Sequence, residues 1–243
     1  MFDRFRSSDR PGAPRSGAYD LLVRHEVLIE IVLVGLLYLL WQTAITYPLR
    51  ILVVFLHELS HAVATWLTGG RVLEFDVVAR GGGHVLSQGG NLFLIFTAGY
   101  LGSLLWGVAF YVAARQTRAD RALLGAIGAV LLIIAVYYGF GSFLMLYGVV
   151  FGLILLAIAI KLPNIVSDIL LRVIGLTSMI YVPLDIVSDT ILRPGLPSDA
   201  ALLGQHFFGG AMFWGGLWLV ISLAVIFWVL RKSWLSGRRP AGG

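Results

Sequence analysis

An H-E-x-x-H sequence, His57 to His61, lies inside an apolar stretch long enough to enter a membrane. Ile51 to Leu56 precede it and Ala62 to Leu67 follow it, and both segments are almost wholly apolar. On a helix, residues four apart lie on one face, so the two imidazoles can bind one metal ion. Ionisable groups at membrane depth are costly and are usually functional. The motif therefore predicts a metal site within a membrane helix.

The middle residue of the motif suggests a division of roles. Glu58 projects about 100° away from His57, so it lies beside a bound metal rather than on it. In this pattern two neutral imidazoles hold Zn²⁺ and the carboxylate accepts a proton from the attacking water. A shuffled chain of this composition would contain roughly 0.002 matches to the motif. The alternative interpretation is a pair of core histidines bonded to neighbouring carbonyls.

The composition places the rest of the chain in a membrane as well. The 243 residues are 58% hydrophobic and only 13% charged, against about 25% charged in a typical soluble domain. The formal net charge is +5, but the basic residues lie mostly at the ends and in short connections, where they meet lipid headgroups. We therefore expect a multi-pass protein of the cell membrane that contacts the lipid bilayer and no nucleic acid. Cysteine is absent from the sequence, which excludes thiolate zinc ligands.

Apolar runs of about the length that crosses a bilayer recur along the chain. Six are predicted to be transmembrane helices: 27–45, 49–67, 91–114, 122–136, 142–160 and 208–230. A further segment, 164–191, has only twelve consecutive charge-free residues, so it is expected to enter the membrane partly. Residues 72–86 alternate polar and apolar side chains around Gly81 to Gly83, which predicts a β-hairpin. The predicted fold class is an all-α polytopic membrane protein with about six transmembrane helices, one partly inserted helix and one short hairpin.

One integral membrane domain, residues 25–236, is expected between two basic tails. Residues 1–24 are rich in Arg, Gly, Pro and Ser and too poor in apolar residues to fold alone, so they are expected to form a disordered cytoplasmic tail. Residues 237–243 form a second, shorter tail. No small-residue cleavage site follows the run 27–45, so this run is expected to be a retained helix rather than a signal peptide.

A catalytic zinc usually has three protein ligands and one open position, so a third ligand must come from elsewhere in the chain. Glu74, in the hairpin, is the only glutamate after the motif. Asp185 follows twelve apolar residues and has no basic residue three or four positions away, whereas Arg193 can pair with Asp189. Asp185 is therefore the expected third ligand, with Asp189 and Glu74 as alternatives.

The remaining acidic residues and histidines have ordinary structural explanations. Asp168 lies four residues before Arg172, which predicts an ion pair. Ser198 can cap a helix that begins at the next residue. His84, on the hairpin, could approach the metal site. Turn and capping roles are expected for three aspartates in connections or at a helix end: Asp76, Asp120 and Asp199.

The motif in a membrane helix, the glycine-rich hairpin after it and the later Leu184-Asp185 pair together resemble the site-2 protease family of intramembrane zinc metalloproteases, particularly its small bacterial members. The resemblance covers roughly residues 48–200. It implies that His57, His61 and Asp185 bind zinc, that Glu58 is the catalytic residue and that the protein lies in a bacterial inner membrane. A second segment, Ser198-Asp199-Ala200-Ala201, is also similar to the small bacterial members, without an assigned role.

The resemblance implies hydrolysis of peptide bonds in a transmembrane protein substrate, with Glu58 as general base. The hairpin could hold an unwound substrate as an added strand, or it could simply link two helices. Two alternative functions stay open. The family's Leu-Asp-Gly reads Leu184-Asp185-Ile186 here, which would fit a zinc-binding scaffold or sensor that cleaves nothing. Embedded His and Asp could instead carry ions in a transporter.

Overall fold

The computed structural model describes residues 26–193 and 197–237. Within these ranges it contains eight α-helices, one π-helical turn and one two-stranded antiparallel hairpin, which confirms the predicted fold class. The tail predicted for residues 1–24 lies outside the described residues, as do residues 238–243 of the second tail.

Six of the described helices are long and apolar enough to cross a membrane, and the chain is a multi-pass membrane protein. These helices are α3 (Tyr47–Leu67), α4 (Leu92–Gln116), α5 (Asp120–Tyr138), α6 (Phe143–Lys161), α7 (Asn164–Val187), which continues into the π-helix η2 (Ser188–Leu192), and α9 (Gly210–Gly237). The other elements are α2 (Glu26–Leu39), β1 (Arg71–Val78), β2 (Gly82–Gln88) and α8 (Asp199–His206).

The first predicted span ends earlier than expected. The described part of α2 has 14 residues and ends at Leu39 rather than at Ile45. Just beyond this end, the Leu40 carbonyl accepts hydrogen bonds from the hydroxyls of Thr43 and Thr46, each at 2.7 Å. Threonine hydroxyls that bond to nearby backbone groups compete with the helix and favour turns.

The segment expected to enter the membrane only partly is a continuous span candidate. Together α7 and η2 extend from Asn164 to Leu192, a length of 29 residues. Two of the charges in this run pair with each other, because Arg172 Nε lies 3.4 Å from Asp168 Oδ1, as predicted. Pairing reduces the cost of keeping two charges inside an apolar bundle.

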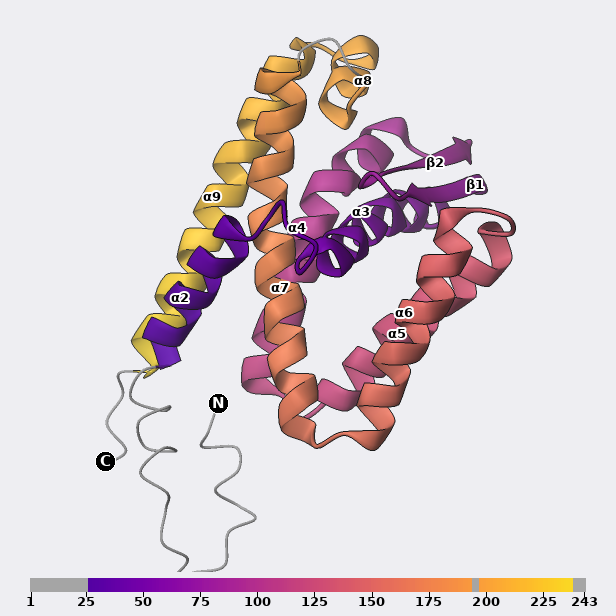
Figure 1. The fold of residues 1–243 in the computed structure, drawn as a ribbon. Coiled ribbons are helices and arrows are strands. Elements are labelled where there is room, and N and C mark those ends of the chain that lie inside the picture. Colours follow the sequence, from indigo (N-terminus) through magenta and orange to yellow (C-terminus); the bar gives the residue numbers. More distant parts are fainter. Residues whose placement is uncertain (1–25, 194–196, 238–243) are drawn as a thin grey trace, which may run out of the picture.

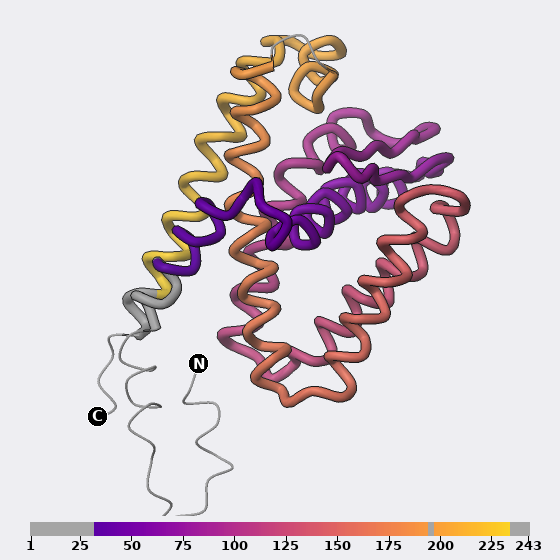
Figure 2. The backbone as a smooth tube through the Cα atoms, in the orientation of Figure 1, coloured from indigo at the N-terminus to yellow at the C-terminus, as the bar shows by residue number. Residues whose placement is uncertain are grey.

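Helix α3 lies in the interior of the bundle. Of the residues in its apolar window, 72% are buried, a larger share than in the other five span candidates. In Figure 1, α3 crosses between α7 and the α5–α6 pair, while α9 and α2 lie beyond α7. The backbone trace in Figure 2 shows the N-terminal helix α2 running next to the C-terminal helix α9. The H-E-x-x-H motif is therefore enclosed by protein rather than by lipid.

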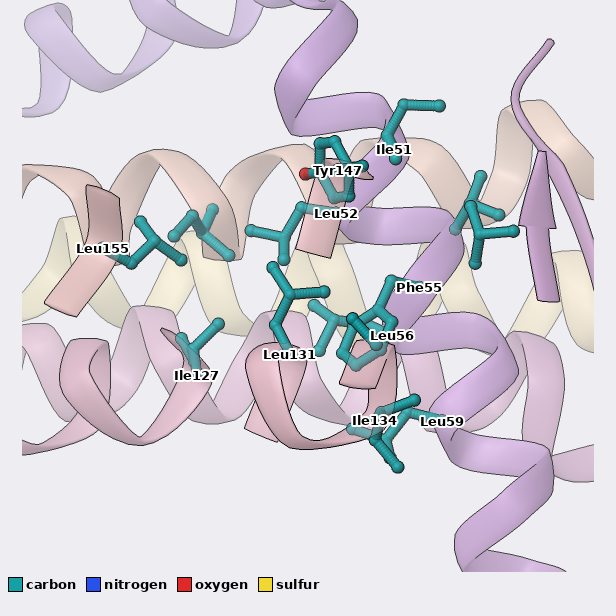
Figure 3. Packing of buried hydrophobic residues seen from close by; sticks show 14 of the residues in the cluster. Ile51, Leu52, Phe55, Leu56, Leu59, Ile127, Leu131, Ile134, Tyr147 and Leu155 are labelled. Atoms are coloured by element: carbon teal, nitrogen blue, oxygen red, sulfur yellow. The ribbon is translucent and has the colours of Figure 1, made fainter. Parts of the chain in front are cut away.

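The core between α3 and the α5–α6 pair consists of large apolar side chains, shown in Figure 3. One set comes from α3 and meets side chains from α5 and α6; the labelled residues are Ile51, Leu52, Phe55, Leu56, Leu59, Ile127, Leu131, Ile134, Tyr147 and Leu155. Close helix packing supports this core, because a Cβ added to Gly152 would lie 2.9 Å from the Gly128 carbonyl oxygen. Small residues allow this approach of two membrane helices.

The predicted hairpin is confirmed, and it packs along α3. Its strands pair antiparallel, with Phe75 opposite Val85. The Phe75 ring lies 5.5 Å from the ring of Phe55 on α3. At the turn, Gly81 has φ +87°, a conformation that glycine adopts without steric cost. The Tyr47 hydroxyl donates to the Ala79 carbonyl at 2.9 Å and so ties the turn to the start of α3.

Candidate metal centre

The two histidines of the motif point to the same side of α3, as their spacing predicts. Both are buried, and their ring centroids lie 4.9 Å apart. His61 is held through its second nitrogen, since Nδ1 lies 2.7 Å from the Ile95 carbonyl oxygen on α4. Such a bond fixes the tautomer and directs Nε2 toward a metal.

Asp199 is the third member of the cluster. Its Oδ2 lies 3.1 Å from Nε2 of His57 and 3.2 Å from Nε2 of His61. Asp199 is the first residue of α8, and the Ser198 hydroxyl caps this helix by accepting from the Ala201 N–H at 3.2 Å, as predicted. Among the side chains that the structure describes, these three His and Asp residues have ligand atoms that all lie within 4.8 Å of one another.

The electrostatics of the cluster suit a bound cation. Burial by itself would raise the pKa of the Asp199 carboxyl, but the neighbouring His61 and His57 outweigh it and hold this pKa well below its usual value. These neighbours favour the ionised form of Asp199. Its Oδ2 is buried and has no well-directed hydrogen bond in the described part of the chain, although two imidazole nitrogens lie close to it. Two imidazoles and one carboxylate form a donor set typical of zinc.

The backbone of α4 borders the space between the three ligand atoms. A Cβ added to Gly99 would lie 2.6 Å from Nε2 of both histidines and would collide with Asp199 Oδ2. Real Cβ atoms do not approach so closely, so glycine is required here to leave this space open. The donor set and the open space at Gly99 together fit a metal ion.

Glu58 lies beside the cluster and not within it. The residue is buried on α3 and lines a pocket of about 530 Å³. Gly83 of β2 packs against it, since a Cβ there would lie 2.7 Å from Glu58 Cγ. The pocket is also lined by His57, His61, His84, Phe96, Tyr100, Tyr181, Asp185, Asp189 and Asp199. A buried carboxylate that lines the same pocket as the three ligand atoms has the position of a proton donor or acceptor.

The structure brings Asp199, and not Asp185, to the two histidines. Asp185 lies in the pocket wall on α7, with the Tyr181 side chain as a neighbour, and is outside the group of converging ligand atoms. The alternative ligand Asp189 accepts from Arg193 at 2.7 Å, which confirms that predicted pair. The physical reason is the position of α8, which folds back onto α4 and delivers Asp199 from outside the spans.

The other alternative ligand lies away from the cluster. Glu74 is exposed on β1, where its Oε2 is 3.6 Å from Nε2 of His84. His84 lines the pocket, as the sequence allowed. Sequence reasoning missed Asp199 because it assigned that residue a capping role. The signal that could have found it was the Ser198-Asp199-Ala200-Ala201 segment, whose similarity to small bacterial members had no assigned role.

The comparison with protein families gives one match. The model of the peptidase M50B-like family matches residues 29–229, a range that includes the H-E-x-x-H helix, the hairpin and α8. No curated protein and no solved structure showed a significant match to the chain.

Proposed function

The chain belongs to the peptidase M50B-like family, and from this premise we propose that it is an intramembrane zinc metalloprotease. The family assignment agrees with the resemblance to site-2 proteases seen in the sequence. The observation that carries the proposal is the convergence of His57, His61 and Asp199 beside Glu58 in the interior of a membrane bundle.

In this proposal His57, His61 and Asp199 hold the metal. A zinc ion bound there would supply Lewis-acid chemistry and would lower the pKa of a water molecule from 15.7 to about 7. Three protein ligands are the number typical of catalytic rather than structural zinc sites.

Glu58 is proposed to be the general base. It follows His57 directly in the chain, so its side chain projects about 100° around the helix from that ligand. The carboxylate lines the pocket and lies outside the metal cluster. From this position it would accept a proton from the attacking water and return a proton to the leaving amine.

The proposed substrate is a transmembrane protein in the same bilayer, here expected to be a bacterial inner membrane. A transmembrane helix keeps its carbonyls in hydrogen bonds to residues four positions on, so the cleaved segment must unwind. The pocket is bordered by residues 81–85 of the hairpin, across from α7. An unwound segment could lie along this hairpin as an added strand.

A cleavage assay with a matched pair of variants tests this function. Purified protein would be incubated with single-span membrane proteins from its own membrane, and the cleaved fragments would be quantified. Glu58→Gln should lose cleavage by at least about a hundredfold and keep its zinc, because Glu58 is not a ligand. Glu74→Gln, the same change on the exposed hairpin strand, should keep both. Equal cleavage by the Glu58→Gln protein and the wild type would disprove the proposed protease function.

A further inference from the structure

Two tyrosine rings on different helices border the ring of His57. Tyr100 of α4 lies 5.3 Å from it and Tyr181 of α7 lies 6.3 Å from it, measured between ring centroids, and both contacts are close to edge-on. His57 Nδ1 is buried and has no hydrogen-bond partner in the described ranges. His61, in contrast, is anchored through its Nδ1 to a carbonyl. The orientation of His57 therefore depends on the aromatic rings packed against it and on Asp199 at its Nε2.

The hydroxyl of one of these tyrosines is fixed by a charged group. Tyr100 is almost fully buried, and its hydroxyl donates to Asp189 Oδ2 at 2.7 Å. The other carboxylate oxygen, Oδ1, accepts from Arg193 Nη2 at 2.7 Å. Charge-assisted hydrogen bonds of this kind are shorter and stronger than neutral ones. A continuous chain of contacts thus joins Arg193, Asp189, Tyr100 and His57.

The backbone around Asp189 is irregular, and it positions Asp189 and Arg193 for this series of contacts. Residues Ser188–Leu192 form a π-helical turn, and the Arg193 N–H donates to the Ser188 carbonyl at 3.0 Å. The Arg193 side chain bonds to the same residue, with Nε 3.1 Å from Ser188 Oγ. Single π-turns inside helices are frequent at functional sites. The Tyr100 ring also packs against α9, where the Trp218 ring lies 5.2 Å from it.

We infer that Asp189 is a positioning residue of the metal centre, which acts through the Tyr100 hydroxyl to hold the His57 ring. The inference rests on the proposed function, because it assumes that His57 binds a metal. In this arrangement the Tyr100 ring, held by its bond to Asp189, packs against the His57 ring, whose Nδ1 has no hydrogen-bond partner in the described ranges. Loss of either group would let the His57 ring rotate and would weaken metal binding without removal of a ligand.

The test compares Tyr100→Phe, Asp189→Asn and the double variant with the wild type. Zinc affinity would be measured by competition with a chelator, and ligand geometry by the visible spectrum of the Co²⁺-substituted protein. Each single variant should bind zinc about tenfold more weakly, as losses around metal ligands typically do, and should show a changed Co²⁺ spectrum. The double variant should bind zinc about as weakly as the singles, since both changes remove the same charge-assisted bond between Tyr100 and Asp189.

Tyr147→Phe is the matched control. The Tyr147 hydroxyl also donates to an oxygen at 2.7 Å, the Pro48 carbonyl, but it does not line the metal pocket. This variant should keep wild-type zinc affinity and an unchanged Co²⁺ spectrum, whatever its effect on Tm. Wild-type affinity in Tyr100→Phe, or additive losses in the double variant, would overturn the inference and leave the protease proposal standing. A wild-type protein that binds no zinc would overturn both.

Discussion

Asp199 Oδ2 lies 3.1 Å from Nε2 of His57, so a short helix outside the six span candidates completes a cluster that begins inside one of them. The two residues are far apart in the sequence and belong to α8 and α3. Any change that displaces α8 would therefore separate the third ligand atom from the other two.

The first prediction distinguishes Asp199 from Asp185 as the third zinc ligand. Asp199→Asn should lower zinc affinity by well over tenfold, because it removes the charged member of the donor set. Asp185→Asn, the same change in the pocket wall, should keep zinc. A chelator titration of both purified variants measures this, and a larger loss of zinc from the Asp185 variant would restore the ligand expected from the sequence.

The second prediction concerns Gly99, which borders the space between the ligand atoms. Gly99→Ala should abolish zinc binding although no ligand changes, because the new Cβ would lie 2.6 Å from both histidine Nε2 atoms. Gly216→Ala on α9 is the control, since nothing lies within 4 Å of a Cβ there. Metal content of the two purified proteins checks this. Full zinc occupancy in Gly99→Ala would contradict the placement of the site.

The third prediction separates the general base from the metal. Gly83→Ala would bring a Cβ within 2.8 Å of Glu58 Oε1, so it should displace the carboxylate, reduce kcat at least about tenfold and leave zinc bound. The adjacent change Gly82→Ala meets only Val78 at an ordinary 3.8 Å and should have little effect. Comparison of kcat and zinc content for both variants tests this, and equal kcat values would argue against the role of Glu58.

The fourth prediction concerns the packing of α5 against α6. Gly148→Ala should lower Tm, because its Cβ would collide with Ala135 and lie 3.2 Å from the Leu131 carbonyl oxygen. Overpacking of this kind costs about 1–3 kcal/mol. Gly125→Ala meets Ala159 at 3.6 Å, an ordinary contact, and should be neutral or slightly stabilising. Thermal unfolding in detergent compares them, and equal Tm values would mean that this interface is looser than described.

Much of the fold could be predicted because apolar runs of bilayer length leave few alternatives. The helix predicted at 49–67 is Tyr47–Leu67, and the run 142–160 is Phe143–Lys161. The end of α2 was harder to predict, since it depends on threonine hydroxyls that compete with the backbone only once the following turn has formed.

The candidate site was also predictable from the sequence only in part. His57, Glu58 and His61 are local on one helix, so their spacing alone predicts that the two imidazoles share a face. Asp199 could not be chosen from its surroundings in the sequence, which are those of a helix start. Its position beside the histidines depends on the packing of α8 against α4. Such a tertiary contact cannot be predicted from the periodicity of the sequence. The sequence favoured Asp185 because it follows a long apolar stretch and has no basic neighbour on its helix. In the structure Asp185 lines the pocket, but it lies outside the group of converging ligand atoms.

The most direct test of the proposed zinc protease is the cleavage rate measured against zinc bound per chain. Wild-type protein would be stripped of metal by a chelator, reconstituted stepwise with Zn²⁺ and assayed on a membrane substrate at each step. We predict no cleavage by the metal-free protein, a rise in rate with occupancy up to one zinc per chain, and no recovery in Asp199→Asn at the same zinc concentrations. Cleavage at the full rate by the metal-free wild type would contradict the proposal.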